Sequence, residues 1–60
     1  MKNYRVFIFD MGHVNAVVVF DAVDDEAALN EAKKQFPEEQ RELWEANRFV
    51  ARLSPEPANG

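Results

Sequence analysis

The sequence predicts a small α+β domain in which one helix packs on one face of an antiparallel sheet, in the order ββαββ or ββαβ. Two stretches rich in β-branched and aromatic residues occupy the first 23 positions, a helical repeat follows, and another apolar stretch lies at residues 48–53. A chain of 60 residues has room for one domain. We expect this domain to span residues 1–53 and residues 54–60 to form a disordered tail.

The first two strands are predicted at residues 4–9 and 15–23, which read YRVFIF and NAVVVFDAV. β-Branched and aromatic side chains are favoured in strands because they pack well on a pleated surface. Between the two stretches, Gly12 can adopt a positive φ angle without steric cost. We therefore expect a tight turn at residues 10–13 and an antiparallel hairpin.

A helix is predicted at residues 25–36. Asp24 can accept hydrogen bonds from the first free N–H groups as the N-cap, and Pro37 disfavours helical geometry at the residue before it. Acids at the start of this segment and lysines at its end suit the helix dipole. Apolar residues recur at helical spacing and are expected in the core: Ala28, Leu29, Ala32 and Phe36.

Residues 38–45 leave two alternatives open, because their composition is helical while the apolar residues that follow suggest a closing hairpin. A short second helix at 38–45 is one alternative. The other, which we favour, is a strand at 42–45, a turn at Ala46 and Asn47, and a last strand at 48–53. Asn47 tolerates the left-handed conformation that such a turn requires.

Side chains alternate between the two faces of a strand, so each predicted strand divides into two sets. One set is expected to pack under the helix: Tyr4, Val6, Ile8, Ala16, Val18, Phe20, Ala22, Phe49, Ala51 and Leu53. The other set forms a face that the single helix cannot cover: Arg5, Phe7, Phe9, Val17, Val19, Arg48, Val50 and Arg52.

An uncovered apolar face usually marks a contact surface. Residues 38–45 could fold over it, but a domain this small supplies only about 3–5 kcal/mol from its own core, which favours help from a second chain. We therefore predict a non-enzymatic protein–protein interaction module. It would form a homodimer, or dock on another protein, through this face or an edge strand.

Trp44 is a large apolar side chain among acids, in the sequence ELWE. The first interpretation is that it caps the core beside Phe36, because tryptophan is heavily buried on average. The second is that it anchors an interface, where tryptophan is also favoured.

Composition argues against several other classes of protein. The chain has no cysteine, so neither a disulfide scaffold nor a cysteine-ligated zinc module is expected. The apolar run of residues 16–20 is too short to span a membrane, and the first residues are too polar for a signal peptide. We expect a cytoplasmic protein without membrane contact.

Few residues could carry chemistry. His13 lies near Asp10 in the predicted turn, but no nucleophile or second base has a visible place beside them. Asp21, Asp24 and Asp25 lack the glycine and the terminal glutamate of a calcium loop. We therefore expect no enzyme activity, no catalytic residue, no metal and no cofactor.

Nucleic acid is the alternative partner. Phe7 and Phe9 could stack single-stranded bases, while Arg5, Arg48 and Arg52 could contact the phosphates. The net charge of −4 argues against binding a polyanion. Single-stranded nucleic-acid binding is accordingly the second hypothesis.

Several short motifs follow one another in a recognisable order: Tyr4-Arg5, Asp10, Gly12-His13, Phe20-x-Ala22-x-Asp24-Asp25-Glu26-Ala27-Ala28, Glu42-Leu43-Trp44 and Arg48-x-Val50-Ala51-Arg52-Leu53. In this order the chain resembles a group of very short bacterial proteins of unassigned function, over residues 4–53. The resemblance implies no activity. The chain departs from the group at residues 45–47, where Glu-Ala-Asn replaces a glycine-bearing turn.

Overall fold

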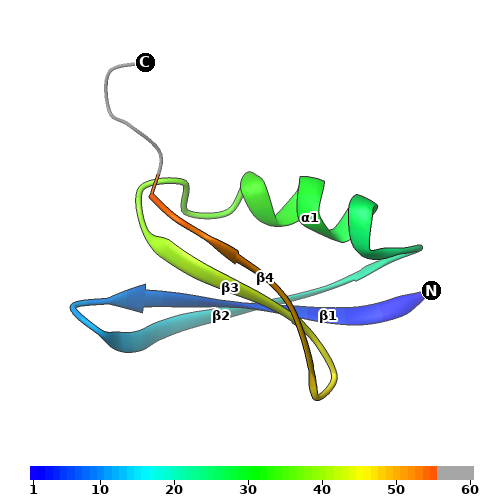
Figure 1. Cartoon of the computed structure of the whole chain (residues 1–60), viewed down its shortest axis with the longest axis horizontal. Coiled ribbons are helices and arrows are strands. Elements are labelled where there is room, and N and C mark those ends of the chain that lie inside the picture. The colour runs from blue at the N-terminus through cyan, green and yellow to red at the C-terminus, as the bar shows by residue number, and fades with distance from the viewer. Residues whose placement is uncertain (56–60) are drawn as a thin grey trace.

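The protein, described here over residues 1–55 of a computed structural model, is a four-stranded antiparallel sheet with one helix packed on it (Figure 1). The elements are β1 (Lys2–Asp10), β2 (His13–Ala22), α1 (Asp25–Lys33), β3 (Gln40–Glu45) and β4 (Arg48–Leu53). The predicted α+β class is confirmed in its ββαββ form, and a second helix at residues 38–45 is wrong. Of the predicted tail at residues 54–60, residues 56–60 lie outside the described residues.

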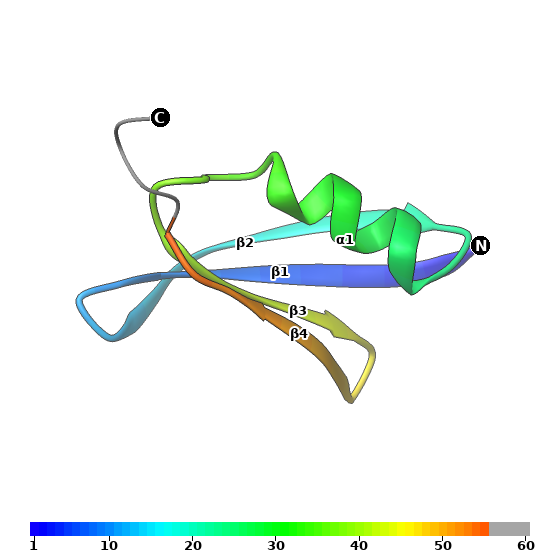
Figure 2. The ribbon, with the colours of Figure 1, turned by 45° about the horizontal axis from the view of Figure 1, so that its top comes forward.

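β1 is an inner strand, because the order across the sheet is β2-β1-β3-β4. β2 and β3 both pair with β1 in the antiparallel sense, so they run parallel to each other on its two sides. The chain passes from β2 to β3 through α1, which lies across one face of the sheet (Figure 2). We call this covered side the inner face and the opposite side the outer face.

The β1–β2 hairpin closes through a two-residue turn in which both Met11 and Gly12 have positive φ angles, 54° and 83°. This combination matches the right-handed twist of paired strands, and the predicted role of Gly12 in the turn is confirmed. Near the turn the register shifts, since Ile8 pairs with Ala16 but Phe9 pairs with Val14. Asn15 is the extra residue of a β-bulge, which places Val14 on the outer face.

α1 begins as predicted and ends earlier. The Asp24 carboxylate accepts a hydrogen bond from the Ala27 N–H at 2.9 Å, as an N-cap does. The helix ends at Lys33, ahead of the Phe36–Pro37 step that disfavours helical geometry, and Phe36 has a φ angle of 48°. Phe36 is consequently 46% exposed, so its predicted place in the helix and the core is wrong.

The core lies between α1 and the inner face. Ala28 and Ala32 are fully buried, and their small side chains let the helix approach the sheet closely. Leu43 joins the core from β3. The buried residues are Tyr4, Val6, Ile8, Ala22, Ala28, Ala32 and Leu43, and the partly buried ones around them are Ala16, Val18, Phe20, Ala27, Leu29, Val50 and Leu53.

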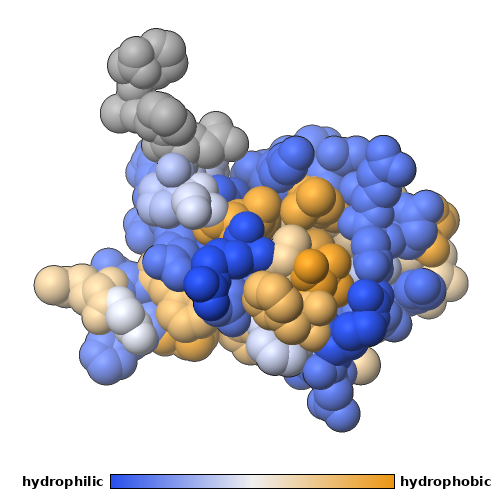
Figure 3. Space-filling model, viewed as in Figure 1, coloured by the Kyte–Doolittle hydropathy of each residue, from blue (hydrophilic) through white to orange (hydrophobic). Residues whose placement is uncertain are grey.

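Part of this core reaches the surface. Figure 3 shows apolar side chains in the middle of the view, below the region of α1, with hydrophilic side chains around them. Leu29 of α1 and Val50 and Leu53 of β4 are only partly buried, although they pack against the core. The single helix is thus barely wide enough to cover the inner face.

Arg41 is the one buried charged residue in the described part of the chain, with 1% of its surface exposed. Its guanidinium donates only to backbone carbonyls. Nε donates to Glu39 at 2.9 Å and Nη2 to Ser54 at 3.0 Å. Nη1 donates to Ala32, Lys33 and Gln35 at 3.4, 3.3 and 3.1 Å. Arg41 therefore ties the C-terminal end of α1 to β3 and to the end of β4, and supplies positive charge where the helix dipole is negative.

β4 contains a second bulge. Leu43 pairs with Ala51, whereas the next residue of β3, Trp44, pairs with Phe49, so Val50 is the extra residue. The bulge turns Phe49 to the outer face, where it is 46% exposed, and lets Val50 pack against the core. The predicted faces of Phe49 and Val50 are both wrong for this reason.

Candidate docking face

The outer face is an open surface of the sheet that no helix or strand within residues 1–55 covers. Its members follow from the strand register, since Arg5 lies between Val19 and Trp44, and Phe7 lies between Val17 and Glu42. They come from all four strands: Arg5, Phe7, Phe9, Val14, Val17, Val19, Glu42, Trp44, Phe49 and Arg52.

The β2 side of this face consists of exposed valines. Val14, Val17 and Val19 are 52%, 46% and 59% exposed, whereas Phe7 and Phe9 on the neighbouring β1 are half-buried. Single exposed apolar side chains are ordinary, but these are adjacent across two strands and form a continuous apolar surface.

The β3–β4 side is aromatic. The ring of Trp44 meets that of Phe7 edge to face, with 6.3 Å between centroids, and that of Phe49 at 5.5 Å. The Trp44 indole N–H donates to Glu42 at 3.2 Å. Trp44 therefore lies on the outer face, and its expected place as a cap of the core beside Phe36 is wrong. Edge-to-face pairs hold aromatic rings in defined positions, so this part of the face is preorganised.

Two of the three arginines predicted for this face have carboxylate partners. Arg52 lies on the outer face and contacts Glu42, with 3.5 Å between Nη2 and Oε2. Arg48 instead donates to the two carboxylate oxygens of Asp25, at 3.1 and 2.7 Å, and to Glu45. Since Asp25 begins α1, the Arg48 side chain turns toward the helix and leaves the outer face.

The Asp25 carboxylate also accepts a hydrogen bond from the buried Tyr4 hydroxyl at 2.8 Å. The bonds from Arg48 and then from Tyr4 lower the pKa of Asp25 to about 2. Burial, followed by the bond to Asp25, raises the pKa of Tyr4 to about 12. The bonds to Asp25 and Glu45 raise the pKa of Arg48. These contacts fasten the start of α1 to the β3–β4 hairpin, and near neutral pH Asp25 and Arg48 are charged while Tyr4 is neutral.

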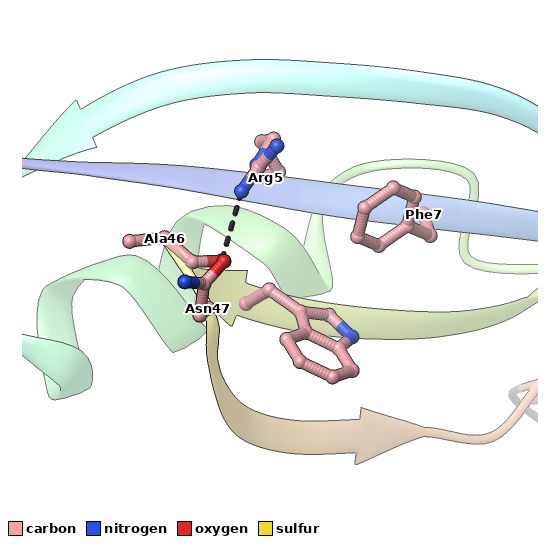
Figure 4. A pocket seen from close by; sticks show the side chains of 5 residues that line it. Arg5, Phe7, Ala46 and Asn47 are labelled. Atoms are coloured by element: carbon pink, nitrogen blue, oxygen red, sulfur yellow. Dashed lines mark hydrogen bonds between the residues drawn. The ribbon is translucent and has the colours of Figure 1, made fainter.

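Arg5 has no carboxylate partner among the described residues. Its Nη2 donates to the Ala46 carbonyl at 2.8 Å, and its guanidinium carbon lies 6.0 Å from the centre of the Phe7 ring. Its Nε is buried without a hydrogen-bond acceptor. Beside it lies an open hollow of about 260 Å³, lined by Arg5, Phe7, Trp44, Ala46 and Asn47 (Figure 4).

The sequence grouped most of the outer face correctly by alternation. Six predicted residues lie together on it: Arg5, Phe7, Phe9, Val17, Val19 and Arg52. Arg48 and Val50 do not, because of the bulge in β4 and the carboxylate of Asp25. Val14 and Phe49, which the bulges of β2 and β4 place on this face, were not predicted from the sequence, and neither was the hollow.

The remaining candidate residues do not form a site. His13 and Asp10 are opposite each other in the strand register, beside the exposed turn, and neither lines the hollow. Within residues 1–55, no three histidine, aspartate or glutamate side chains gather as a metal site would require. Over the same residues, α1 is too short and too polar to cross a membrane.

No protein-family model, curated protein or solved structure matches this chain.

Proposed function

We propose that the protein is a non-enzymatic interaction module in which two copies pack their outer faces together. The continuous apolar outer face carries this proposal. Because one helix is barely enough to close the inner face, the chain has nothing else within residues 1–55 to cover the opposite side. A second copy would bury the valines of β2 and the aromatic rings of β3 and β4.

The size of the face agrees with a weak dimer. Four strands give it a width of about 19 Å, and six residues along a strand give a length of about 20 Å. This flat area of roughly 400 Å² per copy, enlarged by the side chains, is below the ~800 Å² per partner of a standard interface and in the range of weak, transient ones. We therefore expect reversible association in the micromolar range or weaker.

The charges of the face permit the packing of like surfaces. The whole chain has a net charge of −4, but the outer face is balanced, since Arg5 and Arg52 offset Glu42 and Asp21. Asp21 lies at its border and accepts a hydrogen bond from Asn3. Repulsion between two such faces would therefore be small, and most of the excess acid lies elsewhere.

Sedimentation velocity over a range of concentrations tests this proposal. The unmodified chain should pass from monomer to dimer as its concentration rises toward the millimolar range. Val19→Lys should weaken the dimer at least tenfold, because the charge would be buried in the interface. Val23→Lys is the matched control, since Val23 is similarly exposed (61% against 59%) but lies beyond the end of β2.

Two results would overturn self-association through this face. One is a chain that stays monomeric at millimolar concentration. The other is a dimer that Val19→Lys and Val23→Lys weaken equally. If the chain stays monomeric but Phe7, Val19 and Trp44 resonances shift on addition of a different protein, the outer face serves a foreign partner instead.

One observation favours single-stranded nucleic acid as a second candidate. Arg5 lies beside Phe7 and Trp44, the arrangement in which a base can stack while a phosphate meets a cation. Arg48 and Arg52 pair with carboxylates and would add less. Fluorescence polarisation with a labelled oligonucleotide at low salt tests this candidate, and an absence of binding would reject it.

A further inference from the structure

We propose that the hollow beside Arg5 is a binding site for a small ligand that carries a carboxylate on a planar apolar ring. Binding at this site does not require self-association, because one copy of the chain supplies all of its described residues. A bound ligand would, however, occupy part of the outer face and oppose the packing of two copies.

Arg5 provides the first argument. Within the described residues each of the other arginines meets a carboxylate or several carbonyls: Arg41 donates to five backbone carbonyls, Arg48 to Asp25 and Glu45, and Arg52 makes one long contact with Glu42. Arg5 makes a single hydrogen bond, and its Nε is buried with no acceptor. A buried donor without a partner is unfavourable, and a ligand oxygen that reached it would remove that cost.

The guanidinium is held in place for such a ligand. The Ala46 carbonyl accepts from its Nη2, and Ala46 itself has a φ angle of 52°, which is unfavourable for a residue with a β-carbon. The turn thus keeps its carbonyl directed at Arg5 at some cost in backbone energy. A fixed guanidinium pairs with a carboxylate through two parallel hydrogen bonds.

The walls of the hollow specify the rest of the ligand. The rings of Phe7 and Trp44 line it, and they are held edge to face to one another. Its volume of about 260 Å³ is below the usual range for drug-sized ligands, which suits a single ring system. The Asn47 side chain stands at the rim beside Ala46 and can exchange hydrogen bonds with a polar substituent (Figure 4).

A monovalent carboxylate fits this site better than other charged groups. Among residues 1–55, Arg5 is the only cation that lines the hollow, so it can neutralise one negative charge but not a phosphate dianion. A cationic ligand would be repelled by Arg5. The aromatic walls favour a planar apolar body over a fully hydrated one.

The test is a titration of the full chain with benzoate, followed by NMR at a concentration where sedimentation shows monomer. The Arg5 Nε–H and Trp44 Nε1–H resonances report on the hollow directly. Benzoate should shift both with saturation in the millimolar range. Benzamide, a neutral molecule of the same shape, and acetate, which lacks the ring, should each bind at least fivefold more weakly.

Variants separate this site from the rest of the face. Arg5→Gln should reduce benzoate affinity roughly tenfold, since it removes the charge and the bidentate pair. Arg52→Gln is the matched control, because Arg52 is also an outer-face arginine but does not line the hollow. Arg5→Lys keeps the charge and should give an intermediate affinity, and circular dichroism checks that each variant remains folded.

Three results would overturn the proposal: no shift of either resonance with benzoate, equal binding of benzoate and benzamide, or equal losses in Arg5→Gln and Arg52→Gln. Tighter binding of adenosine monophosphate than of benzoate would also overturn it and favour the nucleic-acid candidate. Because the titration is done on the monomer, a chain that never dimerises can still bind benzoate, and a dimerising chain can still fail to bind it.

Discussion

The two faces of the sheet are similar in composition and different in what surrounds them. Each carries apolar side chains and an arginine on its strands, but Arg41 on the inner face is buried with carbonyl acceptors for its donors, whereas Arg5 on the outer face keeps a buried donor without one. The inner face is covered for the most part by α1, whereas no helix or strand within residues 1–55 covers the outer face. Apolar composition alone therefore does not distinguish a core from a contact surface.

Among the residues of the two faces, substitution of Arg41 is expected to lower the free energy of unfolding most. Arg41→Ala would remove the donors to five carbonyls and leave a cavity, and should lower the free energy of unfolding by roughly 3–4 kcal/mol. In a domain of this size that loss could prevent folding. Arg41→Lys, which keeps the charge and fewer donors, should lose about half as much in urea unfolding.

Arg52 gives the matching measurement on the outer face. Its side chain is 63% exposed and its contact with Glu42 is long, so Arg52→Ala should cost less than about 1 kcal/mol. If Arg41→Lys and Arg52→Ala destabilised the chain equally, the distinction between the faces would be wrong.

Asp25 makes the stability of the fold depend on pH in acid. Its pKa of about 2 lies below the ordinary value of 3.8, so its charged form stabilises the fold. That contribution is complete above pH 3.8 and is lost as the pH falls through 2. Asp25→Asn should lower the melting temperature at pH 7 and flatten its decline between pH 4 and 2. Asp21→Asn, at the border of the outer face, is the control and should leave that decline in place.

Tyr4 makes the stability of the fold depend on pH in alkali. Its pKa of about 12 lies above the ordinary value of 10, so the folded protein favours its neutral form. The stabilising contribution is complete below pH 10 and is lost as the pH rises through 12. Since the chain has one tyrosine, absorbance at tyrosinate wavelengths reads this titration directly. A midpoint near 10 in the folded protein would contradict the burial of Tyr4 and its hydrogen bond to Asp25.

These residues also show what the sequence could and could not predict. The strands, the Gly12 turn and the Asp24 cap were predictable because each depends on residues close in sequence. The faces of Phe49 and Val50 were not, because one bulged residue reverses the alternation on which the prediction depends. The partners of Arg41 and the hollow at Arg5 form between distant segments, and local patterns carry no signal for either.

A smaller change in the free energy of unfolding is expected at Ala46. It holds a φ angle of 52° in the β3–β4 turn, whereas the sequence predicted the left-handed conformation at Asn47. Ala46→Gly removes the clash of the β-carbon and should raise the free energy of unfolding by about 0.5–1 kcal/mol. Ala51→Gly, within β4, should instead lower it. A loss of stability in Ala46→Gly would contradict the strained turn.

The smallest effect on stability is expected for the valines of the outer face. Val19→Lys should change the unfolding free energy of the monomer by less than about 0.5 kcal/mol, because Val19 is already 59% exposed. The same substitution should weaken the dimer strongly. A large destabilisation measured at low concentration would mean that the valines belong to the interior after all.

The contacts of Arg41 have a consequence for how this chain can vary. Among the described residues its acceptors are all main-chain oxygens, four of them within residues 32–39, so these hydrogen bonds depend on the backbone path there and not on the identity of the side chains. Substitutions in this connection that keep its backbone path would leave the hydrogen bonds of Arg41 intact, whereas an inserted or deleted residue would displace several acceptors at once. The connection between α1 and β3 should therefore tolerate substitutions but not insertions or deletions.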